Sequence, residues 1–222
     1  MKLNLGCGQN KIEGFVNVDK YGDPDLRVDL ERFPWCPFTE MRGLSGERRF
    51  WADEDVIHDN SVDHVIANHV LEHLGATPDV FIGVMKELYR VCADGATIQI
   101  NVPHPRHDHF IGDPTHVRII TPEVLSLFSK KNCERWAALR AANSPLALYH
   151  DVDFEITETR MMLDGKWADM HDKGLINSVK LDQAIRDHNN VVKEIRMVLQ
   201  VIKPSLILKP GSAMGKTETV SA

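Results

Sequence analysis

The stretch that decides the fold is Leu3-Asn4-Leu5-Gly6-Cys7-Gly8, which is followed by a lone acid at Asp19. The two leucines alternate with a polar residue as in a buried strand, and the two glycines permit a sharp turn close to a ligand. Residues 15–19 form a second strand-like stretch that ends in this carboxylate. Because ligands bind outside the carboxyl ends of neighbouring strands in doubly wound sheets, the sequence predicts a nucleoside site in which Asp19 accepts hydrogen bonds from a ribose.

The same layout occurs in dinucleotide-binding oxidoreductases, whose fingerprint has a third glycine three residues after the second. In this chain Lys11 occupies that position, and residues 9–14 leave room for little more than one helical turn. No long helix N-terminus is therefore expected to face a pyrophosphate. A ligand without a phosphate fits this turn better, and a pair of glycines alone is also compatible with an ordinary tight turn.

The rest of the chain alternates between strand-like and helix-like patterns, as expected for an α/β fold. The expected elements are a buried strand at 62–68, an amphipathic helix at 78–92, a turn at 93–95, a strand at 97–102, a helix that begins at Thr121 and Pro122, and strands at 152–161 and 191–202. The last two strands are long enough to form an antiparallel hairpin. The connection between them, 166–188, has helical character and an unusual length.

Composition and charge exclude several classes of protein. No apolar run approaches the roughly 18 residues of a membrane span, and the first residues leave no room for a signal peptide, so we expect a cytoplasmic protein. The net charge of −6 argues against broad binding of nucleic acid, which needs a basic face. The four cysteines form no C-x-x-C pair, so neither a disulfide framework nor a thiolate zinc site is expected.

Six blocks of sequence resemble the class I S-adenosylmethionine-dependent methyltransferases, and within them a small branch associated with glycans and metabolites. These blocks are residues 3–8, 14–19, 28–34, 59–63, 69–73 and 87–91. The resemblance covers residues 2 to about 122 and is specific for the cofactor, not for the acceptor. It implies a Rossmann-like, doubly wound, mostly parallel α/β sheet of seven strands with an antiparallel C-terminal hairpin. We expect one methyltransferase domain over residues 1–208 and a disordered tail over 209–222.

The resemblance implies S-adenosyl-L-methionine as the cofactor. The implied contacts are Gly6, Cys7 and Gly8 at the methionine half, Asp19 at the ribose, and Asn68 and His69 at the end of a strand that faces the cofactor. Asp29 matches the acid that these enzymes direct toward the adenine amino group. An insertion at 38–57 offers Asp53 as the alternative acid, and we prefer Asp29.

The segment His69-Val70-Leu71-Glu72-His73 also matches the H-x-x-E-H pattern of zinc peptidases. That chemistry needs both histidines on one helix, with the glutamate as the base. The strand-like residues 65–67 instead make His69 the first residue after a strand, so a zinc-dependent hydrolase is a remote alternative. We expect His73 to lie on the surface of the following helix.

A second group of histidines follows the strand that ends at Val102, where a methyl acceptor is expected to enter. The group comprises His104, His107, His109 and His116, with Asp108 and Asp113 among them. An imidazole at this place could remove a proton from an acceptor, several of these groups could hold a divalent metal, or they could make structural hydrogen bonds. The segment 113–116 also resembles a segment of the methyltransferase branch. We select His104, Asp113 and His116 as catalytic candidates and expect no resident metal.

The sequence therefore predicts transfer of a methyl group to an oxygen or nitrogen of a small-molecule or sugar acceptor. The alternatives are a methyltransferase that acts on a nucleobase or a protein, and a non-catalytic subunit that binds S-adenosylmethionine. We expect the cover over the cofactor to come from residues 38–57, the histidine-rich loop and residues 166–188, helped by a second subunit of a homodimer.

Overall fold

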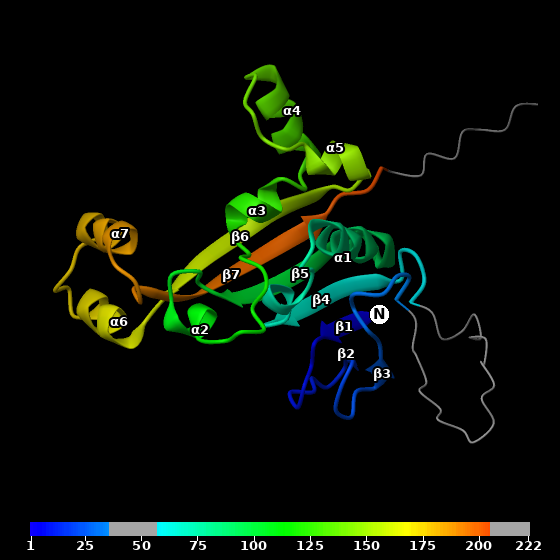
Figure 1. Ribbon diagram of the computed structural model, residues 1–222, viewed down its shortest axis with the longest axis horizontal. Helices are drawn as coiled ribbons and strands as arrows, with labels where there is room; N and C mark the ends of the chain where they lie inside the picture. Colours follow the sequence, from blue (N-terminus) through cyan, green and yellow to red (C-terminus); the bar gives the residue numbers. More distant parts are fainter. Residues whose placement is uncertain (36–56, 205–222) are drawn as a thin grey trace, which may run out of the picture.

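The computed structural model describes residues 1–35 and 57–204. A seven-stranded sheet has the order β3-β2-β1-β4-β5-β7-β6 (Figure 1). The strands are β1 (Lys2–Leu5), β2 (Val16–Asp19), β3 (Leu26–Arg27), β4 (Val62–Asn68), β5 (Cys92–Pro103), β6 (Phe154–Leu163) and β7 (Val192–Val201). Strands β1 to β5 are parallel, and β7 runs antiparallel to both β5 and β6. The predicted Rossmann-like sheet with an antiparallel C-terminal hairpin is confirmed.

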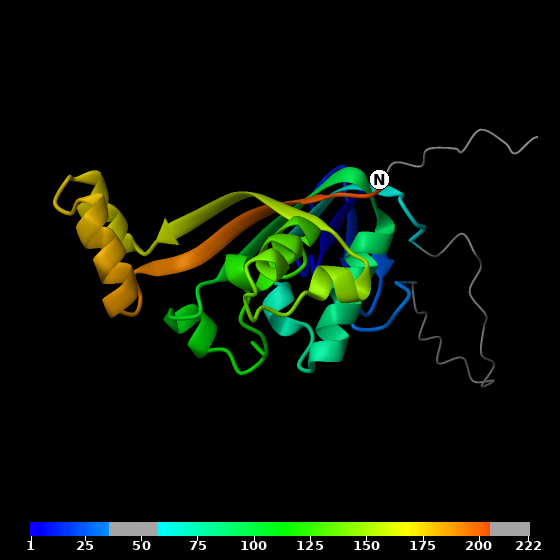
Figure 2. The same ribbon diagram turned by 90° about the horizontal axis from the view of Figure 1, so that it is seen from above.

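The helices lie in the connections between the strands. They are η2 (Leu71–His73), α1 (Pro78–Val91), α2 (Asp108–Ile111), α3 (Pro122–Ser126), α4 (Lys130–Ala138), α5 (Leu146–His150), α6 (Gly165–Asp172) and α7 (Ser178–Asp187). The side chain of Thr121 accepts a hydrogen bond from the amide of Val124 and so caps α3 as predicted. Figure 2 shows α1, α3 and α5 on one side of the sheet.

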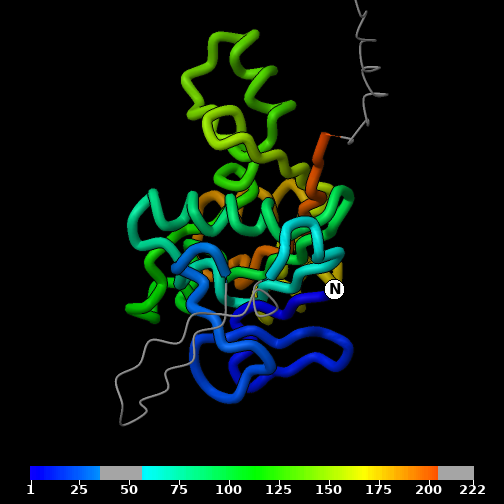
Figure 3. The backbone as a smooth tube through the Cα atoms, turned by 90° about the vertical axis from the view of Figure 1, so that its right-hand side faces the viewer, coloured from blue at the N-terminus to red at the C-terminus, as the bar shows by residue number. Residues whose placement is uncertain are grey.

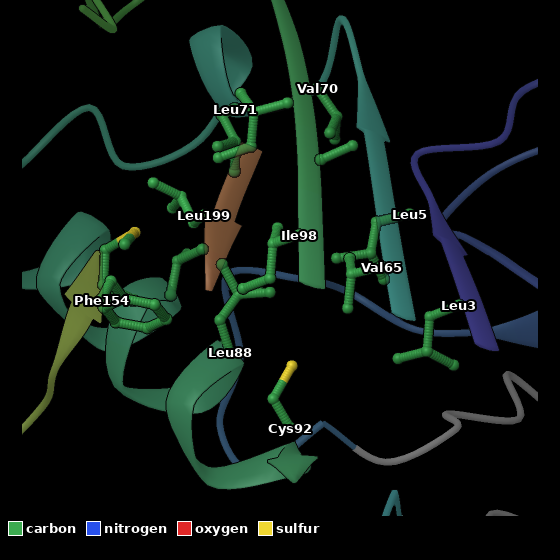
Figure 4. Close-up of a cluster of buried hydrophobic side chains, with 14 of the residues drawn as sticks. Leu3, Leu5, Val65, Val70, Leu71, Leu88, Cys92, Ile98, Phe154 and Leu199 are labelled. Carbon is green, nitrogen blue, oxygen red and sulfur yellow. The ribbon is translucent and has the colours of Figure 1, made fainter. Parts of the chain in front are cut away.

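The core lies between the sheet and α1, as the apolar spacing of both elements requires. Leu3, Val65 and Ile98 come from neighbouring parallel strands and pack with Leu88 of α1 (Figure 4), and all four are fully buried. Burying each such side chain stabilises the fold by about 1.5–3 kcal/mol. On the opposite face of β5 the exposed Gln99 shows that this side of the strand is polar. The core thus anchors the strands whose carboxyl ends form the site.

The hairpin β6–β7 is the longest projection from the sheet. Leu163 pairs with Val192, and between them the chain forms α6 and α7, which lie beyond the end of the sheet (Figures 1 and 2). The helical character predicted for 166–188 is therefore present. Seen from the side in Figure 3, β1 to β3 form one edge of the molecule, and α4 lies beyond the other.

One predicted element is wrong. The turn expected at residues 93–95 lies inside β5, where Gly95 adopts a positive φ of +76°. The register shifts at this point, because Val62 pairs with Cys92 while His64 pairs with Thr97. Residues 93–95 therefore form an irregularity in the pairing of β4 with β5. Strand β5 begins at Cys92, earlier than the composition of these residues indicated.

Some expectations lie outside the described residues. These are nearly all of the insertion 38–57 with Asp53, and the tail 209–222. Among the helices of the described ranges, none is long and apolar enough to cross a membrane.

Candidate functional site

A cavity of about 500 Å³ opens where β1, β2 and β4 end. It is bounded by the turn after β1, the loops after β2 and β3, and the residues that follow β4. Its lining residues are Gly6, Asp19, Lys20, Tyr21, Val28, Asp29, Leu30, Glu31, His69, Val70, His73, Leu74 and Thr115. The position is the carboxyl edge of the parallel strands, which is where ligands bind in folds of this kind.

The carboxylate of Asp19 is held in place by two backbone amides. Gly8 donates to Oδ2 and Tyr21 donates to Oδ1, each over 2.8 Å. Each carboxylate oxygen has a second lone pair, so the side chain retains the capacity to accept hydrogen bonds from a ligand. The glycine turn therefore orients the acid and does not itself contribute a charged group.

The turn after β1 depends on Gly6. This residue has a φ of +60°, and a Cβ atom built on it would lie 2.5 Å from Cγ2 of Val70. Both the backbone conformation and the contact therefore exclude a larger residue without rearrangement. Because Val70 also lines the cavity, Gly6 sets how closely the segment after β4 approaches the turn after β1.

Asp29 is buried at the rear of the cavity and is paired with cations. Its Oδ2 lies 2.8 Å from Nζ of Lys20 and 3.4 Å from Nε of Arg32, and its Oδ1 accepts a hydrogen bond from the amide of Glu31. Burial alone would raise the pKa of Asp29, but these hydrogen bonds and charges outweigh it and hold the pKa below the usual value. The side chain is thus a charged acceptor at neutral pH.

His69 connects β4 with the antiparallel strand β7. It adopts a left-handed backbone conformation with a φ of +50°, and its Nε2 lies 2.8 Å from Oε2 of Glu194. Its Nδ1 lies 3.3 Å from Oε1 of Glu72, which is within ion-pair distance. The carboxylate of Glu72, assisted by that of Glu194, raises the pKa of His69 against the opposing effect of burial. Glu194 is remote in sequence, and the sequence offered no signal for it.

Two histidines of the loop after β5 have structural contacts. Nδ1 of His107 accepts a hydrogen bond from the backbone amide of His109 and so caps α2. Nδ1 of His104 accepts a hydrogen bond from the backbone amide of Arg106. Burial lowers the pKa of both rings, and the charge of Arg106 adds to the effect at His104. Among the contacts of the described residues, none joins His104 to Asp113 or His116, so the three catalytic candidates do not form one cluster.

Asp113 and His116 do lie together, and they meet residues from the segment after β4. His116 Nε2 lies 3.8 Å from Oδ2 of Asp113, and the ring centroids of His116 and His73 are 4.6 Å apart. Nδ1 of His73 lies 2.9 Å from Oγ1 of Thr115. His73 lies on the short helix η2 as expected and is half-buried, because the loop 113–118 packs against this helix.

The structure brings some of the predicted cofactor contacts to the cavity and places others outside it. Gly6, Asp19, Asp29 and His69 line the cavity, whereas Cys7, Gly8 and Asn68 do not. Gly8 lies in an adjoining cavity of about 320 Å³ beside Asp19. The side chain of Asn68 accepts a hydrogen bond from that of Asn101, and Cys7 is buried.

The peptidase arrangement of the H-x-x-E-H segment is not present. Its two histidines lie on a left-handed residue and on a three-residue 3-10 helix, not one turn apart on an α-helix. His69 points to Glu194, while His73 points to Thr115. The two rings therefore do not offer the paired ligands that this chemistry needs.

The comparisons with known proteins show what fold this is. The structure is similar to that of an S-adenosylmethionine-dependent methyltransferase from Archaeoglobus fulgidus, at 15% identity and a TM-score of 0.50 over 90% of this chain and 85% of that chain. A methyltransferase of the same description from Methanosarcina mazei is 14% identical, with a TM-score of 0.45 over 90% and 92%. No protein-family model and no curated protein sequence matches the chain. The likeness establishes a shared Rossmann-like fold.

Proposed function

We propose that this protein is an S-adenosylmethionine-dependent methyltransferase that acts on an oxygen or nitrogen of a small-molecule or sugar acceptor. The observation that carries the proposal is the fixed carboxylate of Asp19 at the end of β2, beside a glycine turn and inside a cavity of about 500 Å³. The sequence resemblance and the fold similarity support the same function independently of this geometry.

The residues present fit an adenosine-containing ligand. Asp19 has free lone pairs for two ribose hydroxyls, and Asp29 offers a charged carboxylate for an adenine amino group. Residues 6–15 contain no helix, so no helix N-terminus is presented to a pyrophosphate there. These features favour a nucleoside without phosphates over a dinucleotide.

The bound cofactor would supply a methyl group activated by a positively charged sulfur. The protein then has to position the acceptor and receive a proton where the acceptor carries one. His104 is our candidate base, because burial and the neighbouring Arg106 lower its pKa and keep the ring neutral at neutral pH. Asp113 and His116 are our candidates for contact with the acceptor, since Thr115 between them lines the cavity. We infer that the enzyme acts in the cytoplasm as one domain, with a homodimer completing its cover.

Calorimetry with purified protein tests the proposal directly. We expect S-adenosylhomocysteine to bind with one site per chain, whereas NADH gives no heat. Formation of S-adenosylhomocysteine from S-adenosylmethionine in the presence of sugar, phenol and amine acceptors then tests catalysis. Binding without turnover on any acceptor would favour the non-catalytic subunit, and absence of binding would refute the proposal.

A further inference from the structure

Glu72 is an unusual carboxylate. Its side chain is fully buried, and neither oxygen accepts a hydrogen bond from any of the described residues. The ring of His69 lies within ion-pair distance of Glu72 Oε1 through Nδ1 and contacts Glu194 through Nε2, so Oε2 of Glu72 remains without a partner among the described residues. A buried carboxylate without a partner is strongly unfavourable, so native proteins pair such groups with a cation or a metal ion. The second oxygen of Glu72 therefore points to a further positive partner.

Two imidazoles lie beside this carboxylate. Glu72, His73 and His116 each offer one donor atom, and the three atoms lie within 4.8 Å of one another. The residues come from η2 and from the loop after α2, which are far apart in the sequence. Backbone hydrogen bonds hold the two segments together, because the amides of Val117 and Arg118 both donate to the carbonyl oxygen of Glu72.

The hydrogen bonds of the two histidines fix their tautomers. Nδ1 of His116 lies 3.0 Å from the carbonyl oxygen of Phe110, which can only accept, so this nitrogen carries the proton. The hydroxyl of Thr115 donates to Asp113 over 2.6 Å and therefore accepts from Nδ1 of His73. Each ring is left with a lone pair on Nε2. Metal-binding histidines have this same arrangement, in which an outer oxygen holds the second ring nitrogen.

We propose that Glu72, His73 and His116 form a binding site for one divalent transition-metal ion. Two imidazole nitrogens and one carboxylate suit zinc, manganese or iron(II), and three protein ligands leave coordination positions open. The site borders the cavity, since His73 and Thr115 are among its lining residues. The ion is thus adjacent to the place where the acceptor must enter.

The position of the ion also indicates the chemical class of the methyl acceptor. This inference rests on the proposed methyl transfer. A hydroxyl bound to the ion has a lowered pKa and releases its proton to a base, for which His104 is our candidate. The resulting oxygen then forms the bond to the methyl carbon as the bond between carbon and sulfur breaks, and the thioether leaves uncharged. We therefore infer a hydroxyl acceptor that binds to the ion through its oxygen.

Cobalt(II) titration of the chelator-stripped full-length chain tests the metal site without any need for activity. We expect one ion per chain, a visible absorption band from nitrogen and oxygen ligands, and displacement by zinc. Glu72→Gln and His116→Gln should each weaken binding about 100-fold or more. His171→Gln removes an exposed histidine of α6 and should leave affinity and stoichiometry unchanged.

Thermal unfolding separates a lost ligand from a lost fold. We expect the stripped Glu72→Gln chain to unfold cooperatively at a temperature close to that of the stripped wild type, because glutamine keeps the size of the side chain and an oxygen that can face Nδ1 of His69. Added zinc should stabilise the wild type and not this variant. Wild-type chain that binds no ion, or variants that bind as tightly as the wild type, would overturn the proposed site. Metal binding without binding of S-adenosylhomocysteine would overturn the function and leave the site standing.

Discussion

The two sides of the cavity treat their carboxylates differently. On the nucleoside side, formed by Gly6, Asp19 and Asp29, each acid is already bonded to protein amides or cations. On the acceptor side, formed by Glu72, His73 and His116, one oxygen of the buried acid lies within ion-pair distance of His69, and the other has no partner among the described residues. An acid that is already bonded to the protein can bind a neutral polar ligand through its remaining lone pairs, whereas a buried acid with an unpartnered oxygen favours a cation. The comparison assigns nucleoside recognition to one side and ion binding to the other.

The largest change in ligand affinity is expected for a substitution of Asp19, which tests whether the two sides of the cavity act independently. Asp19→Ala removes the proposed ribose acceptor, and hydrogen bonds to a charged group contribute about 1.5–3 kcal/mol each. We expect S-adenosylhomocysteine to bind about 100-fold more weakly by calorimetry, with cobalt binding unchanged. Asp19→Asn, which preserves the shape, is the control for loss of the turn. A parallel loss of cobalt binding would break the division into two independent sides.

Gly6 lies at the border of the two sides and should affect stability. Gly6→Ala places a Cβ atom 2.5 Å from Val70 in a left-handed conformation, which we expect to cost about 2 kcal/mol. Chemical denaturation measures this cost. The double variant with Val70→Ala should recover the steric part and retain the backbone part. If the second substitution recovered nothing, the contact with Val70 would not set the distance between the two sides.

Replacement of residues 166–188 tests whether this segment covers the acceptor side and not the nucleoside side. Arg106 in the loop after β5 donates to the carbonyl oxygens of Ile185 and Arg186, so α7 supports this loop. Replacing residues 166–188 with a short turn should raise the acceptor KM about tenfold and leave binding of S-adenosylhomocysteine unchanged. Equal loss of both would contradict an assignment of this segment to the acceptor. Arg106→Lys is a milder variant that should give a smaller shift in the same direction.

The smallest expected effect is on the pH dependence of stability, through Asp25, which holds Asn17 of β2 in place. Asp25 accepts hydrogen bonds from the amide and side chain of Asn17 and from Lys11, and these lower its pKa to about 2. Its stabilising effect is therefore present above the ordinary value near 3.8 and is lost as pH falls through about 2. Asp25→Asn should differ from wild type in urea midpoint at pH 6, and the difference should shrink toward pH 2.

A matched acid on the same loop provides the control for this pH experiment. Asp23 has a fully exposed side chain, and Asp23→Asn should leave the urea midpoint close to that of wild type at every pH. A constant difference between wild type and Asp25→Asn down to pH 2 would show that these hydrogen bonds do not stabilise the ionised form.

The sequence predicted the fold and the nucleoside side better than the acceptor side, for a physical reason. The glycine turn, the alternating strands and Asp19 lie within one short stretch, so local geometry determines their relation. The proximity of Glu72 to His116, and the contact of His69 with Glu194, depend on how the loop after β5 and strand β7 pack against η2. Periodicity and spacing carry no information on such contacts.

The antiparallel direction of β7 has a consequence for the order in which parts of the protein fold. Because this strand is antiparallel, its beginning lies at the edge where the parallel strands end, and Glu194 reaches His69 across 125 positions of the chain. Contacts this distant in the chain form later than local ones, because a long loop must close first. The Asp19 turn joins residues only 11 positions apart, so it can form before this contact between β4 and β7.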